Sequence, residues 1–195
     1  MKLPEPRHDG QVSLEKSLFE RRSVRSYSGK PLTLLEVSQL LWAAQGITSP
    51  EGLRTAPSAG ALYPLELYAV VGNIEGLPAG VYRYIPDSHQ LVRKMDGDRR
   101  KALAGAALGQ TSVLDGALSF VFTAVYERTT GKYGERGTRY VHMEVGHAAQ
   151  NLCLQAVALG LGAVTVGAFS DAEVSQLLDL SREELPLYII PVGRR

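Results

Sequence analysis

The stretch ALSFVFTAVY, residues 117–126, combines aliphatic, aromatic and β-branched side chains and contains no charged residue, glycine or proline. A run of this length and composition favours a buried β-strand over a helix. We therefore expect it at the centre of a sheet, where strands that precede and follow it along the chain pair with it.

Strands are predicted on both sides of this stretch. Residues 65–72, 80–85 and 90–95 are rich in aromatic and aliphatic side chains and are bounded by Gly, Pro, Asp or Asn. Pro86-Asp87-Ser88 predicts a turn between the last two. Beyond the central stretch, residues 163–166 and 187–192 predict two more strands.

Helices are expected between the strands. Residues 138–160 carry few helix breakers and predict the longest helix, whose small and apolar faces imply burial. Thr33 with Glu36 forms a capping box that begins a helix ending near Gly46. Shorter helices are predicted at residues 13–20 and 99–108 and after the cap patterns Ser170 with Glu173 and Ser181 with Glu184, whereas residues 128–137 are expected to form a polar loop. The irregular interleaving favours an α+β sandwich with a mixed sheet.

Composition limits the class of protein. The chain has 195 residues, 21 Lys plus Arg against 20 Asp plus Glu, and 45% hydrophobic residues, which predicts one globular domain over residues 1–195, with residues 1–12 as a flexible or extended arm. A near-zero net charge favours neither nucleic acid nor membrane as a partner. The single Cys153 and an N-terminus without an apolar run give no sign of secretion, so a cytoplasmic location is expected.

Common cofactor motifs are absent or weak. No Walker or Rossmann glycine pattern occurs, and Gly160-Leu161-Gly162 is interpreted as a helix stop. Glu144 and His147 have a spacing that di-iron bundles use, but it occurs once, so no metal is predicted. Cys153 is interpreted as a small buried hydrophobic side chain.

Two segments suggest ligand binding. Arg21-Arg22-Ser23-Val24-Arg25 is either a solvated charge run or a phosphate grip, because guanidinium forks and a serine hydroxyl suit phosphate. The terminal Arg194 and Arg195 could join it. The loop at residues 54–64 is either a surface connection or a close backbone approach to a flat ligand, since its residues are small and prolines restrict it at both ends.

Four blocks of sequence, in a fixed order and spacing, span nearly the whole chain. They are RRSVRSY at 21–27, APSAGALYPLELYAVV at 56–71, GHAAQNLCLQAVALGLGAVTVGAF at 146–169 and the terminal PVGRR. Together they resemble the nitroreductase family of flavin enzymes. The tyrosine and proline of the second block, with KYGER at 132–136, resemble the branch that contains the azoline dehydrogenases of thiazole and oxazole peptide maturation.

The resemblance implies a nitroreductase-like α+β fold, with a mixed, mainly antiparallel sheet flanked by helices. It also implies an intertwined homodimer with FMN at the interface, hydride transfer between NAD(P)H or an organic substrate and an acceptor such as a nitro compound or quinone, and ping-pong kinetics. By position, the implied FMN contacts fall in four groups: Arg21, Arg22, Ser23 and Arg25; Pro57, Ser58 and Ala59 from the other subunit; Gln110 with Thr165, Val166, Gly167 and Ala168; and Arg194 with Arg195.

Two other activities remain open at this point. If the azoline-dehydrogenase likeness is functional, Lys132 and Tyr133 act as base and partner while a ring of a modified peptide is oxidised. If turnover is absent, the chain is a flavin-binding protein, an alternative prompted by Ala61, which stands where many relatives carry asparagine. A flavin-free interaction domain is a third reading.

Overall fold

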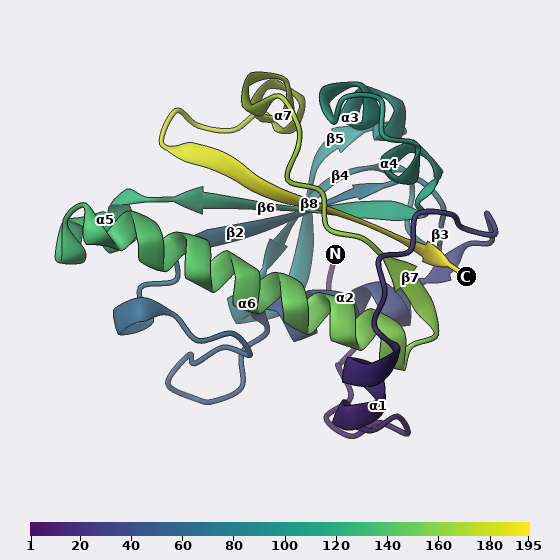
Figure 1. Ribbon diagram of the computed structural model, residues 1–195, viewed down its shortest axis with the longest axis horizontal. Coiled ribbons are helices and arrows are strands. Elements are labelled where there is room, and N and C mark those ends of the chain that lie inside the picture. The colour runs from purple at the N-terminus through teal and green to yellow at the C-terminus, as the bar shows by residue number, and fades with distance from the viewer.

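The computed structural model describes residues 1–195 and contains one large sheet between two helical layers (Figure 1). The sheet has six strands in the order β5-β4-β2-β6-β8-β7, and every neighbouring pair is antiparallel. The strands are β2 (Leu65–Val71), β4 (Gly80–Ile85), β5 (Gln90–Asp96), β6 (Leu118–Val125), β7 (Leu161–Ala163) and β8 (Glu184–Arg194). Strand β6 contains most of ALSFVFTAVY and lies between β2 and β8, which confirms its central place.

Among the strands, parallel pairing occurs only outside the large sheet. Strands β1 (Leu32–Thr33) and β3 (Ile74–Glu75) form a two-stranded parallel pair. A single parallel bridge joins Ser23 to Ala163. The architecture is therefore α+β with a mainly antiparallel pattern, as expected.

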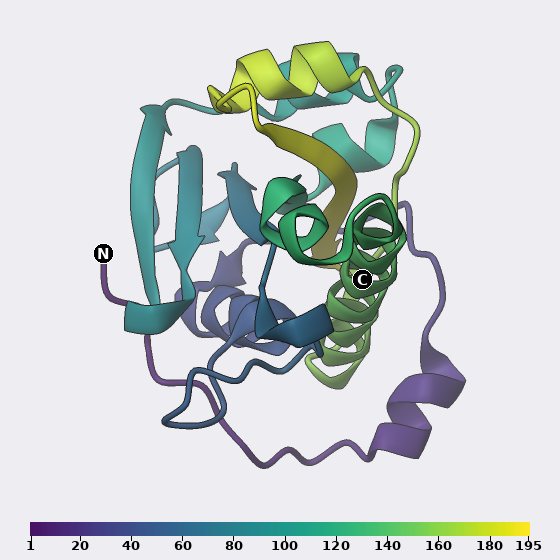
Figure 2. The ribbon, with the colours of Figure 1, turned by 90° about the vertical axis from the view of Figure 1, so that its left-hand side faces the viewer.

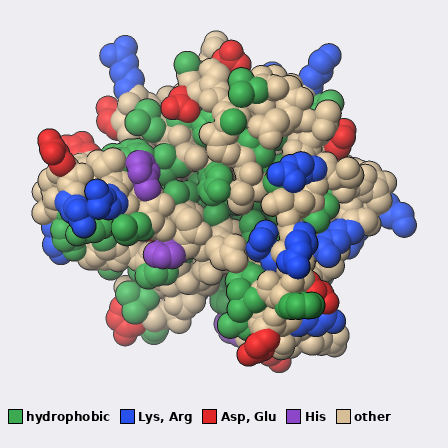
Figure 3. Space-filling view, in the orientation of Figure 1, with side chains coloured by type: hydrophobic (Ala, Val, Ile, Leu, Met, Phe, Trp, Pro, Cys, Tyr) green, Lys and Arg blue, Asp and Glu red, His purple; other side chains and the backbone are tan.

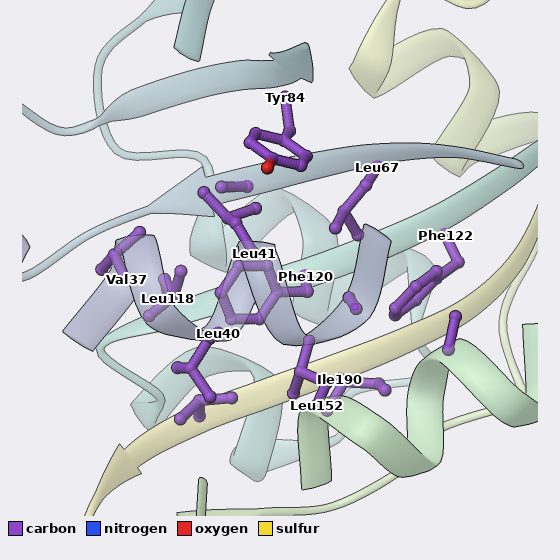
Figure 4. Close-up of a cluster of buried hydrophobic side chains, with 14 of the residues drawn as sticks. Val37, Leu40, Leu41, Leu67, Tyr84, Leu118, Phe120, Phe122, Leu152 and Ile190 are labelled. Atoms are coloured by element: carbon purple, nitrogen blue, oxygen red, sulfur yellow. The ribbon is translucent and has the colours of Figure 1, made fainter. Parts of the chain in front are cut away.

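Alternation along the strands directs side chains to two cores. Odd-numbered residues of β2 and even-numbered residues of β6 face α2 (Leu34–Gln45) and α6 (Arg136–Ala158), in a cluster that includes Leu67, Phe120 and Leu152 (Figure 4). The opposite face, with Tyr68, Val70 and Val121, packs against α3 (Arg100–Ala106), α4 (Thr111–Asp115) and α7 (Asp171–Leu178). Helices thus cover both faces of the sheet.

Side-chain caps explain three of the helix starts. The hydroxyl of Thr33 accepts the backbone N–H of Glu36, whose carboxylate accepts the N–H of Thr33, so both halves of the capping box that starts α2 are present. Ser170 accepts the N–H of Glu173 at the start of α7. Helix α1 (Leu14–Glu20) begins at Ser13 in the same way.

Residues 1–12 run in an extended path along one side of the molecule. Lys2 forms a bridge with Gln90 at the edge of β5, and Leu3 is buried. The His8 ring stacks on Trp42 of α2. The N-terminal arm is therefore attached at several points.

The polar loop expected at residues 128–137 is instead helical. Helix α5 (Glu127–Tyr133) follows β6, and α6 begins at Arg136. Tertiary contacts outweigh the weak local propensity here: Arg128 bonds to Glu66 and to the carbonyl of Tyr63. A Cβ on Gly137 would lie 2.8 Å from Thr130 Cα, so this glycine permits the close packing of α5 on α6.

The helix expected after Ser181 is absent. The N–H of Glu184 bonds to the carbonyl of Ser181 in a turn, and β8 begins at Glu184. The same polar residues that suit a helix cap also suit such a turn, and the apolar run that follows pairs with β6.

Strand β7 also lies earlier than predicted, at residues 161–163 rather than 163–166. Val166 still pairs with Ile189 in an isolated bridge. Between the end of β7 and this bridge, Val164 lies opposite Pro191, whose nitrogen has no hydrogen to donate. The missing bond interrupts the ladder and leaves residues 164–166 as a loosely paired edge.

The longest helix, α6, is amphipathic, and none of the helices has the continuous apolar length that a membrane crossing requires.

Candidate cofactor site

An open cavity of about 500 Å³ lies beside α6, near the end of the chain. Its wall comes from three regions: the segment after α1, one flank of α6, and the edge formed by β7 and β8. The lining residues are Arg21, Ser23, Gly146, Ala149, Gln150, Cys153, Ala163, Val164, Thr165 and Tyr188. Three of the predicted cofactor contacts, Arg21, Ser23 and Thr165, therefore share one cavity.

The segment after α1 reaches this cavity by pairing with the sheet edge. The N–H of Val24 bonds to the carbonyl of Ala163 at 2.9 Å, and the Tyr27 hydroxyl lies within hydrogen-bond distance of Pro191 O, at 3.1 Å. Two glycines leave the space for this contact. A Cβ on Gly162 would lie 2.6 Å from a Val24 methyl carbon, and one on Gly193 would lie 2.6 Å from the Tyr27 ring.

The arginines of this segment carry unneutralised charge. None of the protein's seven ion pairs includes Arg21, Arg22 or Arg25. Arg21 lines the cavity with Ser23, while Arg22 donates to backbone carbonyls of Phe19 and Arg21. Arg22 and Arg25 are exposed and lie outside the lining. Lys and Arg side chains gather over this side of the molecule (Figure 3).

The turn at residues 165–168 offers backbone donors. The N–H groups of Thr165, Gly167 and Ala168 donate no hydrogen bond within the chain, and all three residues are exposed. Val166 is held by its bridge to Ile189. The side-chain amide of Gln110 donates to the carbonyl of Ala168 at 3.2 Å, so Gln110 stabilises the turn.

The two terminal arginines are engaged elsewhere. The guanidinium of Arg194 pairs with the Glu36 carboxylate at 2.8 Å and also donates to the carbonyl of Pro31. Arg195 donates to the carbonyl of Leu161 at 3.1 Å. A phosphate contact by Arg194 would require its ion pair with the α2 capping box to open.

The second predicted group lies on the other flank of α6. Asn151 of α6 donates to the carbonyl of Thr55 at 3.2 Å. The Ser58 hydroxyl is close enough to the Glu144 carboxyl to lower the pKa of that carboxyl by hydrogen bonding. Each residue of an α-helix turns by about 100°, so Glu144 and Gly146 point about 200° apart. The loop around Pro57, Ser58 and Ala59 and the Arg21 cavity are thus separated by the helix itself. Figures 1 and 2 show the loop and the segment after α1 on opposite sides of α6.

The loop at residues 54–64 has a strained backbone that is held by hydrogen bonding and stacking. Gly60, Ala61 and Tyr63 all have positive φ, at 65°, 53° and 45°, a region that costs free energy for side chains other than glycine or asparagine. The Ser58 hydroxyl accepts the N–H of Tyr63 at 2.9 Å. The Arg54 guanidinium stacks 4.4 Å above the Tyr63 ring centroid.

Lys132 and Tyr133 face this same loop from α5. A Cβ on Gly60 would lie 2.8 Å from the Tyr133 hydroxyl and 3.1 Å from Lys132 Nζ. The Tyr133 ring packs edge-on against Tyr140 of α6, and Lys132 Nζ lies 5.5 Å from the Tyr133 ring centroid. The two proposed catalytic side chains therefore belong with the loop group, not with the Arg21 cavity.

Two buried titratable side chains of α6 adjoin these groups. Glu144 is 3% exposed, and burial raises its pKa to about 7, although the neighbouring Ser58 and Arg54 lower it. Burial likewise raises the pKa of the Cys153 thiol to about 11, so this residue is a buried, protonated thiol in the cavity wall. His147 is exposed and lies outside the cavity.

Some cavity residues are not among the predicted contacts. Gly146, Ala149 and Gln150 belong to a matching block, but only the helical periodicity places them on one flank of α6. Tyr188 of β8 gives no sequence signal, because its place depends on the pairing of β8 with the edge at residues 164–166.

Comparison with known proteins gives the family. The pattern of the nitroreductase family matches residues 18–194. MJ1384 of Methanocaldococcus jannaschii, named as a nitroreductase, is 50% identical over 185 residues, which cover 95% of this chain and 92% of the relative. The chain belongs to the nitroreductase family of oxidoreductases.

Solved structures agree in fold. A crystal structure of a protein named as a nitroreductase, from Ralstonia eutropha JMP134, has a TM-score of 0.86 at 31% identity, and the match covers 99% of this chain and 88% of the solved chain. A chain of the Escherichia coli microcin synthetase McbBCD complex, solved with truncated pro-MccB17 bound, has a TM-score of 0.76 at 26% identity, with 95% and 73% covered. The family therefore includes peptide-processing relatives of this chain.

Proposed function

We propose that this chain is an FMN-dependent oxidoreductase that acts as a homodimer, with each flavin site built from two chains. One observation carries the proposal. The residues that the family resemblance assigns to FMN fall into two groups on opposite flanks of α6, one in the Arg21 cavity and one in the loop at residues 57–59. A site that needs both groups is complete only when a second chain supplies one of them.

The groups present fit the chemistry of FMN. Arg21 takes part in none of the ion pairs and lines the same cavity as Ser23, so a guanidinium and a hydroxyl are both available there to donate to a phosphate. The unused backbone N–H groups of residues 165, 167 and 168 suit the polar edge of a flavin ring. Gly146 and Ala149 leave the flank of α6 nearly bare, and a Cβ on Gly146 would meet nothing within 4 Å.

Each group has a separate task in this account. Arg21 and Ser23 hold the phosphate, with Arg22 and Arg25 adding positive charge nearby. Residues 165–168, braced by Gln110, present backbone donors to the ring. Pro57, Ser58 and Ala59 of the second chain cover the ring from the other side. Arg195, and Arg194 if its ion pair opens, add charge at the phosphate end.

Bound FMN supplies the redox chemistry by accepting a hydride and passing it on. The chain's own residues therefore bind, orient and exclude water. We propose NAD(P)H as the reductant and a nitro compound or quinone as the acceptor, which use the same open face in turn and give ping-pong kinetics.

A second candidate is oxidation of azoline-type rings in modified peptides. It is favoured by Lys132 and Tyr133, which lie against Gly60 of the loop that would cover the ring. In this reaction Lys132 accepts the ring proton and Tyr133 orients the substrate. Replacing Lys132 with Gln should abolish azoline oxidation while leaving quinone reduction by NADPH within about twofold of wild type.

The experiment that tests the proposed function follows the visible spectrum of purified protein during anaerobic addition of NADPH. The account predicts one FMN per chain by mass, loss of the oxidised-flavin absorption on addition, and its return when a quinone is added. Bound flavin that stays oxidised would favour a binding protein without turnover. A chain that is colourless and takes up no added FMN would contradict both.

A further inference from the structure

A cluster of buried polar groups lies beneath the loop at residues 54–63. The protein has five buried side-chain polar atoms without a hydrogen-bond partner. Three of them, Gln45 Nε2, Arg54 Nε and Glu144 Oε1, belong to this cluster. Most of the protein's buried side-chain polar atoms without a hydrogen-bond partner therefore lie at the loop that is proposed to cover the flavin ring.

The geometry around Glu144 favours its neutral form. The side chain is almost wholly buried, it takes part in none of the ion pairs, and one carboxyl oxygen receives no donor. A carboxylate so placed would lose solvation without replacing it, whereas a protonated carboxyl pays a much smaller penalty. The surroundings of the Glu144 carboxyl therefore favour its protonated form.

The neighbours of Glu144 set how easily it gives the proton up. Arg54 is the cation whose charge acts on Glu144, but its guanidinium is held by Gln45 Oε1 at 2.7 Å and stacks over the Tyr63 ring. Burial raises the pKa of Glu144 to about 7, and Ser58 and Arg54 act against that rise. The remaining titratable groups nearby are Lys132 and Tyr133 across Gly60 and, one turn away along α6, Tyr140 and His147.

We propose that Glu144 is the proton store of the site, passing a proton through the Ser58 hydroxyl to the acceptor as that acceptor is reduced; this rests on the proposed function. Ser58 is the link because it adjoins Glu144 and belongs to the loop that covers the ring. Glu144 itself touches neither substrate nor cofactor and acts only through Ser58.

The step balances for a quinone acceptor. NAD(P)H supplies the hydride by way of the flavin, and the quinone also needs one proton to become a hydroquinone. Ser58 gives its hydroxyl proton to the quinone oxygen and takes the proton of Glu144. The Glu144 carboxylate then recovers a proton from water, so NAD(P)H, one proton and the quinone become NAD(P)⁺ and the hydroquinone.

The first test needs no flavin. Glu144 has a raised pKa in the folded protein, so between about pH 4.5 and 7 the folded state binds more protons than the unfolded state. The free energy of unfolding of the wild type should therefore fall, relative to Glu144→Gln, as pH rises through this window. The matched control is Glu184→Gln. Glu184 lies on β8, and its buried carboxyl accepts from the Thr123 hydroxyl of β6, so this variant should keep the wild-type fall. A wild-type curve parallel to that of Glu144→Gln would overturn the inference.

The second test follows quinone reduction by the FMN-loaded protein. For the wild type, kcat/KM for the quinone should decrease as pH rises through about 7. Glu144→Gln should lose this limb and run about tenfold or more slower at pH 6, while its reduction by NADPH is unchanged. Ser58→Ala should slow the same half-reaction but keep the pH-dependent stability of the first test.

The outcomes separate the inference from the proposed function. A normal flavin spectrum with the same pH profile in wild type and Glu144→Gln overturns the proton store alone. A protein that takes up no flavin ends the proposed function and the donor role together, even if Glu144 titrates as expected.

Discussion

At the scale of single residues, Arg21 and Arg194 show that an arginine's ion-pair partners decide whether it is free to bind a phosphate. Both arginines belong to blocks that resemble phosphate-binding positions. Arg21 lines the cavity without an anionic partner, whereas Arg194 is paired with Glu36, which also caps α2. A guanidinium that is already paired must give up that pair before it can hold a phosphate.

This contrast gives a direct prediction. Arg21→Ala should weaken FMN binding by about tenfold or more, because it removes charge-assisted hydrogen bonds to phosphate. Arg194→Ala should lower the free energy of unfolding by about 1 kcal/mol and leave FMN affinity within about twofold. Flavin fluorescence titration and denaturant unfolding measure the two quantities. Equal losses of affinity in both variants would refute the assignment.

Ala61 carries a separate prediction. Its φ of 53° lies in the left-handed region, which asparagine tolerates better than alanine. Ala61→Asn should therefore raise the free energy of unfolding by about 0.5–1 kcal/mol in chemical denaturation. Ala59→Asn, in the same loop but without positive φ, should give no gain. A stabilisation shared by both variants would show that backbone strain is not the cause.

The structure brings Arg21, Ser23 and Thr165, three residues that the matching blocks single out, into one cavity, and their chemistry suits an anionic ligand. Their contact with FMN stays a prediction. The spacing of Glu144 and His147 raises only the question of a metal ligand. The burial of Glu144 and its position beneath Ser58 depend on the packing of a loop 86 residues earlier, which the spacing within α6 does not reveal.

At the scale of elements, Gly162 and Gly193 allow the segment after α1 to lie against the sheet edge. Gly193→Ala would bring a Cβ to 2.6 Å from the Tyr27 ring. We expect it to lower the free energy of unfolding by about 1–3 kcal/mol and, by displacing the arginine segment, to weaken FMN binding.

A matched control is Gly105→Ala. Gly105 lies inside α3, with open space at its Cβ position, so alanine should stabilise the chain by up to about 1 kcal/mol. Unfolding is compared at a fixed chain concentration, since assembly would shift the curves. If Gly193→Ala behaved like Gly105→Ala, the close approach would not be what holds the segment.

Element prediction was most successful for long, patterned segments. The strands β2, β4, β5 and β6 and the helix α6 were all predicted within a few residues. The misses share a cause, because contacts distant in sequence decided them. Arg128 and Gly137 stabilise α5 against its low helix propensity, and Pro191 removes the hydrogen bond that would have carried β7 to residue 166.

At the scale of the whole molecule, α6 divides the predicted flavin contacts between its two flanks, and α1 extends from one side. Phe19 on α1 is 79% exposed, and Leu14, Leu18 and Met143 are also exposed. Such a surface is costly in water unless another chain covers it. The fold class could be predicted from the sequence, and the family resemblance also implied that Pro57, Ser58 and Ala59 come from the other subunit. The flank of α6 that each segment reaches could not be predicted, because it depends on how segments distant in sequence pack on that helix.

We therefore predict that the wild type sediments as a dimer at micromolar concentrations. Phe19→Glu places a charge in the exposed apolar surface and should shift the equilibrium toward the monomer with loss of FMN. Lys101→Glu, at an exposed position of α3 on the opposite side of the sheet, is the control and should remain dimeric. A wild type that sediments as a folded, flavin-loaded monomer would contradict the prediction.

The most direct measurement of the two-chain site is subunit complementation, read as FMN per dimer from visible absorption. Arg21→Glu damages the cavity group and Ala59→Trp damages the loop group, so either variant alone should bind no FMN. Mixed dimers, isolated through two different tags, should bind about one FMN per dimer, because one of their two sites combines the intact groups of both chains. Mixed dimers without FMN, or a single variant that binds FMN normally, would contradict a site shared between two chains.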